Sequence, residues 1–235
     1  MRKTLLSIFI LLLTYVHIDG QILQQELVAR KRVLLLMGTR FEITAVATSN
    51  ILADQGIEAG IAEVKRIEAI ISSWDPNSQT TSINNNAGIK PVTVNKELFD
   101  LINRSIRISN LTNGAFDISF ASVGQLWHFD GSMTTPPPAE AIATSVQHVN
   151  YKNIILDAEN STVFLKEKGM KIGFGGIGKG YAAEQAKKVM IANGIKSGVV
   201  SAAGDLTTWG RREDGKIWDV ALAKPDKSRK ILAWL

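Results

Sequence analysis

The stretch KIGFGGIGKGYAAEQ (residues 171–185) places five glycines within eight residues, directly before a sequence that favours a helix. Lys179 stands between the last two of these glycines. Glycine lets a ligand approach the backbone closely, and the free N–H groups at the start of a helix bind anions. The stretch therefore predicts a loop that handles a phosphate. The other interpretation is a tight turn that only packs a strand on a helix.

Two common nucleotide-binding motifs match this loop only in part. The dinucleotide pattern G-x-G-x-x-G fits Gly173, Gly175 and Gly178, but the acidic residue expected about 20 positions later is met only by Asp205, 27 residues after Gly178. About 57 residues follow Gly178, too few for the rest of a doubly wound domain. The triphosphate pattern requires a hydroxyl after the lysine, where Gly180 stands. Neither motif explains the loop.

Composition excludes several classes of site. The chain has 235 residues, a net charge of +5 and no cysteine, which rules out disulfides, thiolate metal sites and a cysteine nucleophile. Three histidines are too few to favour a histidine zinc site. No basic run of five or more residues is present, so we predict no nucleic-acid partner.

The N-terminus, MRKTLLSIFILLLTYVHIDGQ, has the layout of a secretory signal peptide. Arg2 and Lys3 precede an apolar run over residues 5–16, and Gly20 offers a small residue for cleavage. We therefore predict a signal peptide at residues 1–20, a single domain at 21–235, and export to the periplasm or cell envelope. An uncleaved N-terminus tethered to the inner membrane is the other interpretation.

Hydrophobic spacing and turn residues predict an α+β fold, with a mixed sheet and packed helices. The predicted helices cover 51–71, begin at an Asn95 cap, and run from Gly180 to Gly194; strands are predicted at 40–47, 197–203 and 218–223, a hairpin at 153–166 and a loop at 134–140. The apolar faces of the first two helices comprise Ile57, Ile61, Val64, Ile67 and Ile71, then Leu98, Leu101, Ile102 and Ile106.

Four further stretches indicate a function only when they are considered together. They are LMGTRFEI (36–43), SSWDPNSQTTSINNNAG (72–88), TNGAFDISFASVGQLWHF (112–129) and GVVSAAGDLTTWG (198–210). Taken singly, Met37 reads as core filler, Trp74 as a surface aromatic and Asp117 as a turn cap. Together and in this order, from about Leu36 to Pro225, they resemble the ApbE family of flavin transferases. The glycine loop resembles that family's Asp-Leu-Gly-Gly-Ile-Ala-Lys-Gly-Tyr motif.

The resemblance implies an exported enzyme that uses FAD as substrate and Mg²⁺ as cofactor. Such an enzyme cleaves the FAD pyrophosphate and joins the FMN half to a threonine, or sometimes a serine, of an acceptor protein, and AMP leaves. The implied FAD-binding residues are Met37, Trp74, Ala115, Phe116, Asp117, Gly173 and Lys179. The implied metal ligand is the backbone carbonyl of Gly176, and the resemblance assigns no catalytic residue.

Two departures from the family shape the expectation. Gly173 stands where the family's loop begins with Asp, and the family's remaining metal ligands belong to a region beyond Leu235. We therefore expect a C-terminally incomplete flavin transferase with weak or no activity. The alternatives are a non-catalytic exported flavin-binding protein and a protein with this fold that binds no flavin. The sequence indicates neither the acceptor protein nor the oligomeric state.

Overall fold

The computed structural model describes residues 26–124, 126–127, 132–224 and 230–234. The predicted signal peptide lies outside these residues. Within them, no helix combines the length and apolar character that a membrane span requires.

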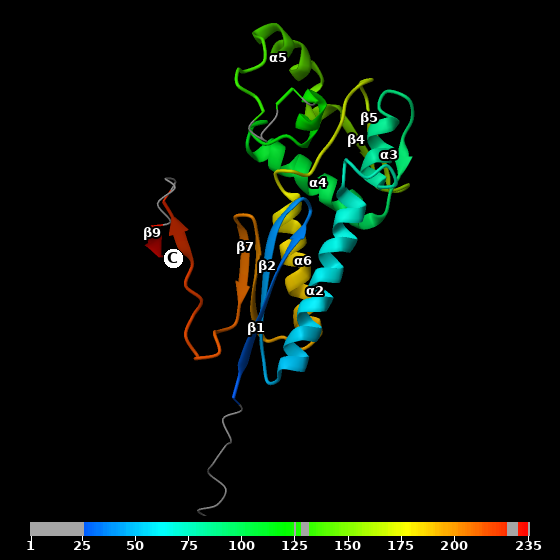
Figure 1. Cartoon of the computed structure of the whole chain (residues 1–235). Coiled ribbons are helices and arrows are strands. Elements are labelled where there is room, and N and C mark those ends of the chain that lie inside the picture. The colour runs from blue at the N-terminus through cyan, green and yellow to red at the C-terminus, as the bar shows by residue number, and fades with distance from the viewer. Residues whose placement is uncertain (1–25, 125, 128–131, 225–229, 235) are drawn as a thin grey trace, which may run out of the picture.

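The core of the fold is a four-stranded sheet in the order β1-β2-β6-β7 (Figure 1). Its strands are β1 (Val28–Leu36), β2 (Thr39–Ala47), β6 (Ser197–Ala202) and β7 (Asp205–Trp209). Strand β2 alternates as predicted, with Phe41, Ile43 and Ala45 fully buried on one face. Helices α2 (Asn50–Ile71) and α6 (Gly178–Ala192) cover that face (Figure 1).

A second region lies beyond the end of α2 that is nearest to α4 (Figure 1). Its helices are α3 (Gln79–Asn85), α4 (Lys96–Leu111), η1 (Ile118–Val123), α5 (Ala139–Ser145), η2 (Val146–His148) and η3 (Tyr151–Asn153). Its three-stranded sheet, ordered β3-β5-β4, consists of β3 (Val92–Thr93), β4 (Ile154–Asp157) and β5 (Thr162–Leu165). A separate pair, β8 (Ala221–Ala223) and β9 (Ile231–Trp234), follows β7.

The α+β class and most predicted elements are confirmed. The predicted faces of α2 and α4 are buried, apart from Ile106, which is half-buried, and the Asn95 side chain accepts a hydrogen bond from the N–H of Leu98 at 2.7 Å. Strands β4 and β5 form the predicted hairpin. Helix α6 ends before Gly194, whose φ of 85° suits glycine.

Four expectations need correction. Every pairing between the described strands is antiparallel, so the expected mixed sheet is not seen there. Helix α6 begins at Gly178, because the carbonyl of its N-cap, Ile177, already accepts the N–H of Tyr181 at 3.0 Å. The predicted loop ends at Pro138, since a proline at a helix boundary permits α5 to start at Ala139. The strand expected at 218–223 is reduced to β8, which pairs with β9.

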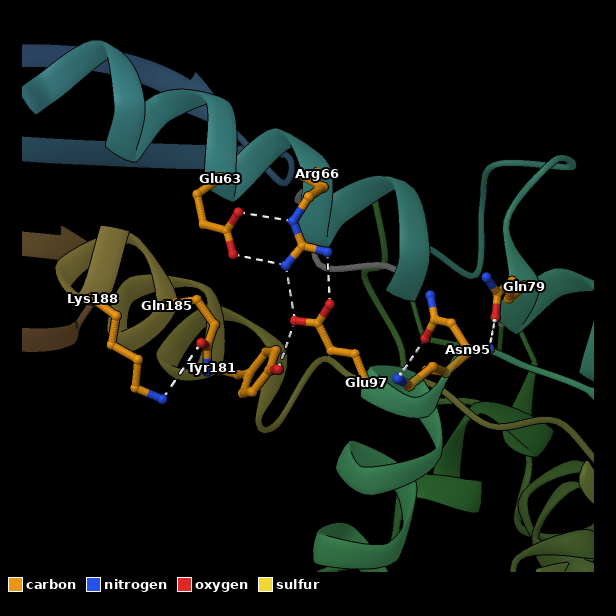
Figure 2. Close-up of polar contacts among 9 residues, drawn as sticks. Glu63, Arg66, Gln79, Asn95, Glu97, Tyr181, Gln185 and Lys188 are labelled. Carbon is orange, nitrogen blue, oxygen red and sulfur yellow. Dashed lines mark hydrogen bonds and ion pairs between the residues drawn. The ribbon is translucent and has the colours of Figure 1, made fainter. Parts of the chain in front are cut away.

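A polar network joins α2, α4 and α6 (Figure 2). The guanidinium of Arg66 lies between two carboxylates, bonding Glu63 at 2.7 and 2.8 Å and Glu97 at 2.6 and 2.9 Å. The hydroxyl of Tyr181, in the first turn of α6, donates to Glu97 Oε1 at 2.8 Å. Bidentate Arg–carboxylate pairs fix geometry as well as charge. This network therefore holds the start of α6 against the start of α4 and against α2.

The same contacts shift the ionisation of the network. The hydrogen bonds from Arg66, together with that from Tyr181, outweigh burial and hold the pKa of Glu97 below its ordinary value of 4.5. Burial, followed by the hydrogen bond to Glu97, raises the pKa of Tyr181. Both shifts favour a charged carboxylate facing a neutral phenol across the pH range in which the network is intact.

We expect Glu97→Gln to lower the free energy of unfolding in a pH-dependent manner. Because the pKa of Glu97 is depressed in the folded state, its stabilising contribution is fully present above about pH 4.5 and is lost as the pH falls through the folded pKa. Urea unfolding of both proteins between about pH 7 and about pH 3 measures this difference. Parallel stability curves across that range would contradict the assignment.

Strand β6 can carry only glycine at residue 198. A Cβ atom there would lie 2.4 Å from the backbone oxygen of Thr44 and 2.7 Å from the ring of Trp209. Since the neighbouring strand cannot move without breaking the ladder, we expect Gly198→Ala to cost about 1–3 kcal/mol in denaturant unfolding. Ser201→Ala in the same strand is the matched control and should change stability by less than about 0.5 kcal/mol. Equal effects of the two substitutions would refute this packing argument.

Candidate functional site

The entry to the glycine loop is held from two sides. The side chain of Asn84 on α3 pairs with the backbone of Ile172, accepting its N–H at 2.8 Å and donating to its carbonyl at 3.0 Å. On the other side, the N–H of Lys171 donates to Ser122 Oγ at 2.9 Å, and the N–H of Gly173 donates to the carbonyl of Ile118 at 2.9 Å. Residues 171–173 are thus fixed between α3 and η1.

The exit of the loop is closely packed around residue 178. A Cβ atom on Gly178 would lie 2.8 Å from Cδ1 of Ile71 and 3.6 Å from Cε of Met37. Met37 reaches this place from the tight turn between β1 and β2, where Met37 and Gly38 have φ values of 50° and 69°. The turn and the glycine loop therefore meet at the start of α6.

Backbone donors remain free along this loop. The N–H groups of Gly175, Gly176, Lys179 and Gly180 donate no hydrogen bond to any residue that the structure describes. The ammonium of Lys179 folds back to the carbonyl of Gly175 at 3.2 Å. Free N–H groups at a helix start together with a lysine form a site for an anion such as a phosphate.

The stretch 112–117 reaches the same loop through Phe116. The Phe116 ring lies 3.2 Å from where a Cβ of Gly176 would be, so it covers this glycine. Asp117 uses both carboxylate oxygens within the protein: Oδ1 accepts from the N–H and the hydroxyl of Ser119, and Oδ2 accepts from the N–H of Tyr151 at 2.9 Å. Asp117 therefore connects η1 to η3, and a contact between its side chain and FAD stays a prediction.

The structure thus brings together Met37, Phe116, Gly173, Gly176 and Lys179. Trp74 follows the end of α2 only three residues after Ile71, but it is 78% exposed and its ring is not packed into the loop. Ala115 is exposed, with its N–H bonded to the carbonyl of Thr112. The FAD contacts proposed for these two residues stay predictions.

The described residues do not by themselves fit Mg²⁺. They contain no group of three or more His, Asp or Glu side chains that could hold a metal ion. The carbonyl of Gly176 accepts no hydrogen bond from them and is a suitable oxygen ligand. A single carbonyl cannot supply the near-octahedral oxygen shell that Mg²⁺ requires.

A larger hollow lies on the main sheet, away from this loop. A cavity of ≈ 550 Å³ lies on the face opposite α2 and α6, with Glu42, Thr44, Ser201 and Trp218 in its wall. A smaller one of ≈ 350 Å³ lies beside Asp117 and Tyr151. We place the candidate site at the glycine loop, because unpaired donors and a cation identify a ligand site more specifically than volume does.

Three residues at the site were not predicted from the sequence. Asn84 and Ser122 hold the loop entry, and the ring of Phe120 lies over Gly173 and Gly175. The sequence offers two signals, the polar run SINNNAG and an apolar Phe120 three residues after the end of GAFD. Neither signal reveals that its residue contacts a backbone segment some 50 to 90 positions later in the chain.

The comparisons with known proteins identify relatives of this chain. The ApbE family model matches residues 37–235. The FAD:protein FMN transferase of Klebsiella pneumoniae (strain 342) is 28% identical over 202 residues, which is 84% of this chain and 58% of that protein. The chain spans about half the length of several other FAD:protein FMN transferases, including that of Escherichia coli K12 at 26% identity.

Solved structures give the same fold. The ApbE protein of Thermotoga maritima superposes with a TM-score of 0.79 at 28% identity, covering 88% of this chain and 67% of that one. The flavin transferase ApbE of Vibrio cholerae superposes with a TM-score of 0.77 at 18% identity, covering 88% and 67%. With the family model matching most of its length and the glycine loop within the matched region, the chain belongs to the ApbE family.

Proposed function

We propose that this protein is a flavin transferase that moves the FMN half of FAD to the hydroxyl of a threonine or serine on an acceptor protein. The observation that carries the proposal is the loop itself. Four backbone N–H groups, at Gly175, Gly176, Lys179 and Gly180, donate to no residue that the structure describes, and they lie with the Lys179 ammonium along this loop and at the start of α6 in a chain of the ApbE family. A pyrophosphate is the kind of anion that such a loop binds.

The reaction would be a phosphoryl transfer. The hydroxyl oxygen of the acceptor forms a bond to the phosphorus of the FMN half, the bond from that phosphorus to the bridging oxygen breaks, and AMP leaves with the bridging oxygen. The hydroxyl proton is released. Such reactions depend on positioning and charge neutralisation, which the N–H groups and Lys179 would supply to the pyrophosphate. Mg²⁺ belongs to the proposal through the family resemblance, without ligands among the described side chains.

The cellular setting is also part of the proposal. The signal-peptide layout of residues 1–20 supports export to the periplasm or cell envelope. The acceptor protein would then be exported or face the same compartment, and its threonine or serine must lie in an accessible segment to reach the loop.

A second candidate is a non-catalytic flavin-binding protein, and two observations favour it. Gly173 stands where the family motif has Asp, and the described residues contain no group of side chains able to hold a metal. Neither feature removes the N–H groups or the lysine that would bind the phosphates. Binding and transfer can therefore be separated by experiment.

Mass spectrometry tests the proposed transfer. The whole chain is incubated with FAD, Mg²⁺ and an acceptor protein, and the proposal expects a weak mass gain on the acceptor equal to FMN together with an equal amount of AMP. Removing Mg²⁺ with a chelator should abolish the gain, because the pyrophosphate charge is then not neutralised. FAD binding without AMP release would instead establish the second candidate, and no FAD binding would refute both.

Lys179→Ala should weaken FAD binding by about tenfold, since it removes a cation beside the proposed pyrophosphate. The affinity of the parent protein should fall with added salt more steeply than that of the variant. Lys188→Ala is the matched control, because Lys188 is an exposed lysine on the same helix, bonded only to Gln185 among the described residues. Titration calorimetry measures all three proteins. Equal losses in both variants would show that only general surface charge is involved.

A further inference from the structure

The ring of Phe120 covers the beginning of the glycine loop. A Cβ atom on Gly175 would lie 3.3 Å from Cζ of Phe120, and one on Gly173 would lie 3.7 Å from the same atom. Phe120 is nevertheless 46% exposed, although it is a large apolar side chain on a segment that is otherwise well packed. Together with Phe116 over Gly176, two aromatic rings therefore line the loop over Gly173, Gly175 and Gly176.

The segment that carries this ring is firmly placed. Phe120 lies in η1, which is tied to the loop by the Gly173–Ile118 hydrogen bond and by Ser122, whose hydroxyl donates to the carbonyl of Lys171 at 3.1 Å. Asp117 caps the start of η1. A phenylalanine has only two side-chain torsions, so a ring on a fixed backbone presents its exposed part at little entropic cost.

The ring also occupies the space beside residue 173. A Cβ there would lie 3.1 Å from Cβ of Ala121 and 3.7 Å from the Phe120 ring, so apolar atoms border the space beside this position. Apolar and aromatic atoms thus border the loop at Gly173, Gly175 and Gly176, and the same loop carries Lys179 and N–H groups that donate to no residue that the structure describes. A ligand that uses both features carries a phosphate joined to a flat aromatic ring.

We propose that Phe120 is a ligand-contacting residue, whose exposed ring packs on a heteroaromatic ring of FAD while the loop holds the phosphates. This inference rests on the proposed function. In this chain Gly173 stands where the family motif has an aspartate, and the ring of Phe120 supplies a ligand contact beside this position. The isoalloxazine and the adenine of FAD share the required chemistry, and the experiment distinguishes them.

The test measures FAD affinity by titration calorimetry on the whole chain. Phe120→Leu removes the ring and should weaken FAD binding by roughly 2- to 12-fold, the range for an aromatic pair. Phe120→Tyr keeps the ring and should restore the parent affinity. Phe164→Leu is the matched control, because it removes a half-buried ring from β5, away from the loop, and should leave affinity unchanged. If Phe120→Leu does not melt cooperatively, Phe120→Met replaces it.

The smaller ligands FMN and ADP identify the ring. If Phe120→Leu weakens the affinity for FMN alone, the ring that packs on Phe120 is the isoalloxazine. If it weakens the affinity for ADP alone, that ring is the adenine. Unchanged affinity of Phe120→Leu for FAD would overturn this inference and leave the proposed function standing. Absence of FAD binding by the parent chain would overturn both.

We further expect Gly173→Asp to lower the melting temperature without improving FAD affinity, and a gain in affinity would contradict the role of Phe120.

Discussion

Helix α6 has to begin at a buried glycine while the N–H groups of Lys179 and Gly180 in its first turn donate to no residue that the structure describes, and the rest of the site depends on this constraint. Its N-cap, Ile177, offers no side-chain hydrogen bond, and Gly178 is buried. Unpaired donors at a helix start are costly, so the position must be stabilised by other contacts. The packing of Ile71 and Met37 on Gly178 and the Tyr181–Glu97–Arg66 network supply them.

Sequence reasoning succeeded where the determining interactions are local. The apolar face of α2 follows from helical spacing alone, and the Asn95 cap follows from a residue type three positions before its donor. It failed where partners are distant: Asn84 and Ile172 are 88 residues apart, and Glu97 and Tyr181 are 84 apart. Neither pairing leaves a periodic pattern, because each uses single side chains that also suit a surface.

The sheets illustrate the same limit. The apolar alternation of β2 predicted a strand because one face packs on two helices, while β1, with exposed Lys31 and Val33, carries a weak signal. The stretch 218–223 alternates as well as β2 does over a shorter length, yet only its last three residues form a strand, because pairing with β9 limits the extent. Strand length is thus set by the partner and not by the alternation.

For the site, the glycine pattern predicted where the loop lies but not which of its glycines pack against side chains and which leave their N–H groups available. Glycines at 173, 175 and 176 admit aromatic rings, whereas Gly178 admits an isoleucine and a methionine, so one sequence feature serves two kinds of packing. The N–H groups that donate to no described residue belong to Gly175 and Gly176, beside the aromatic rings, and to Lys179 and Gly180, directly after Gly178. Phosphate binding needs only those donors, while transfer also needs charge neutralisation on both sides of the breaking bond. A loop of this kind can therefore keep its ligand even where the chemistry of transfer is incomplete.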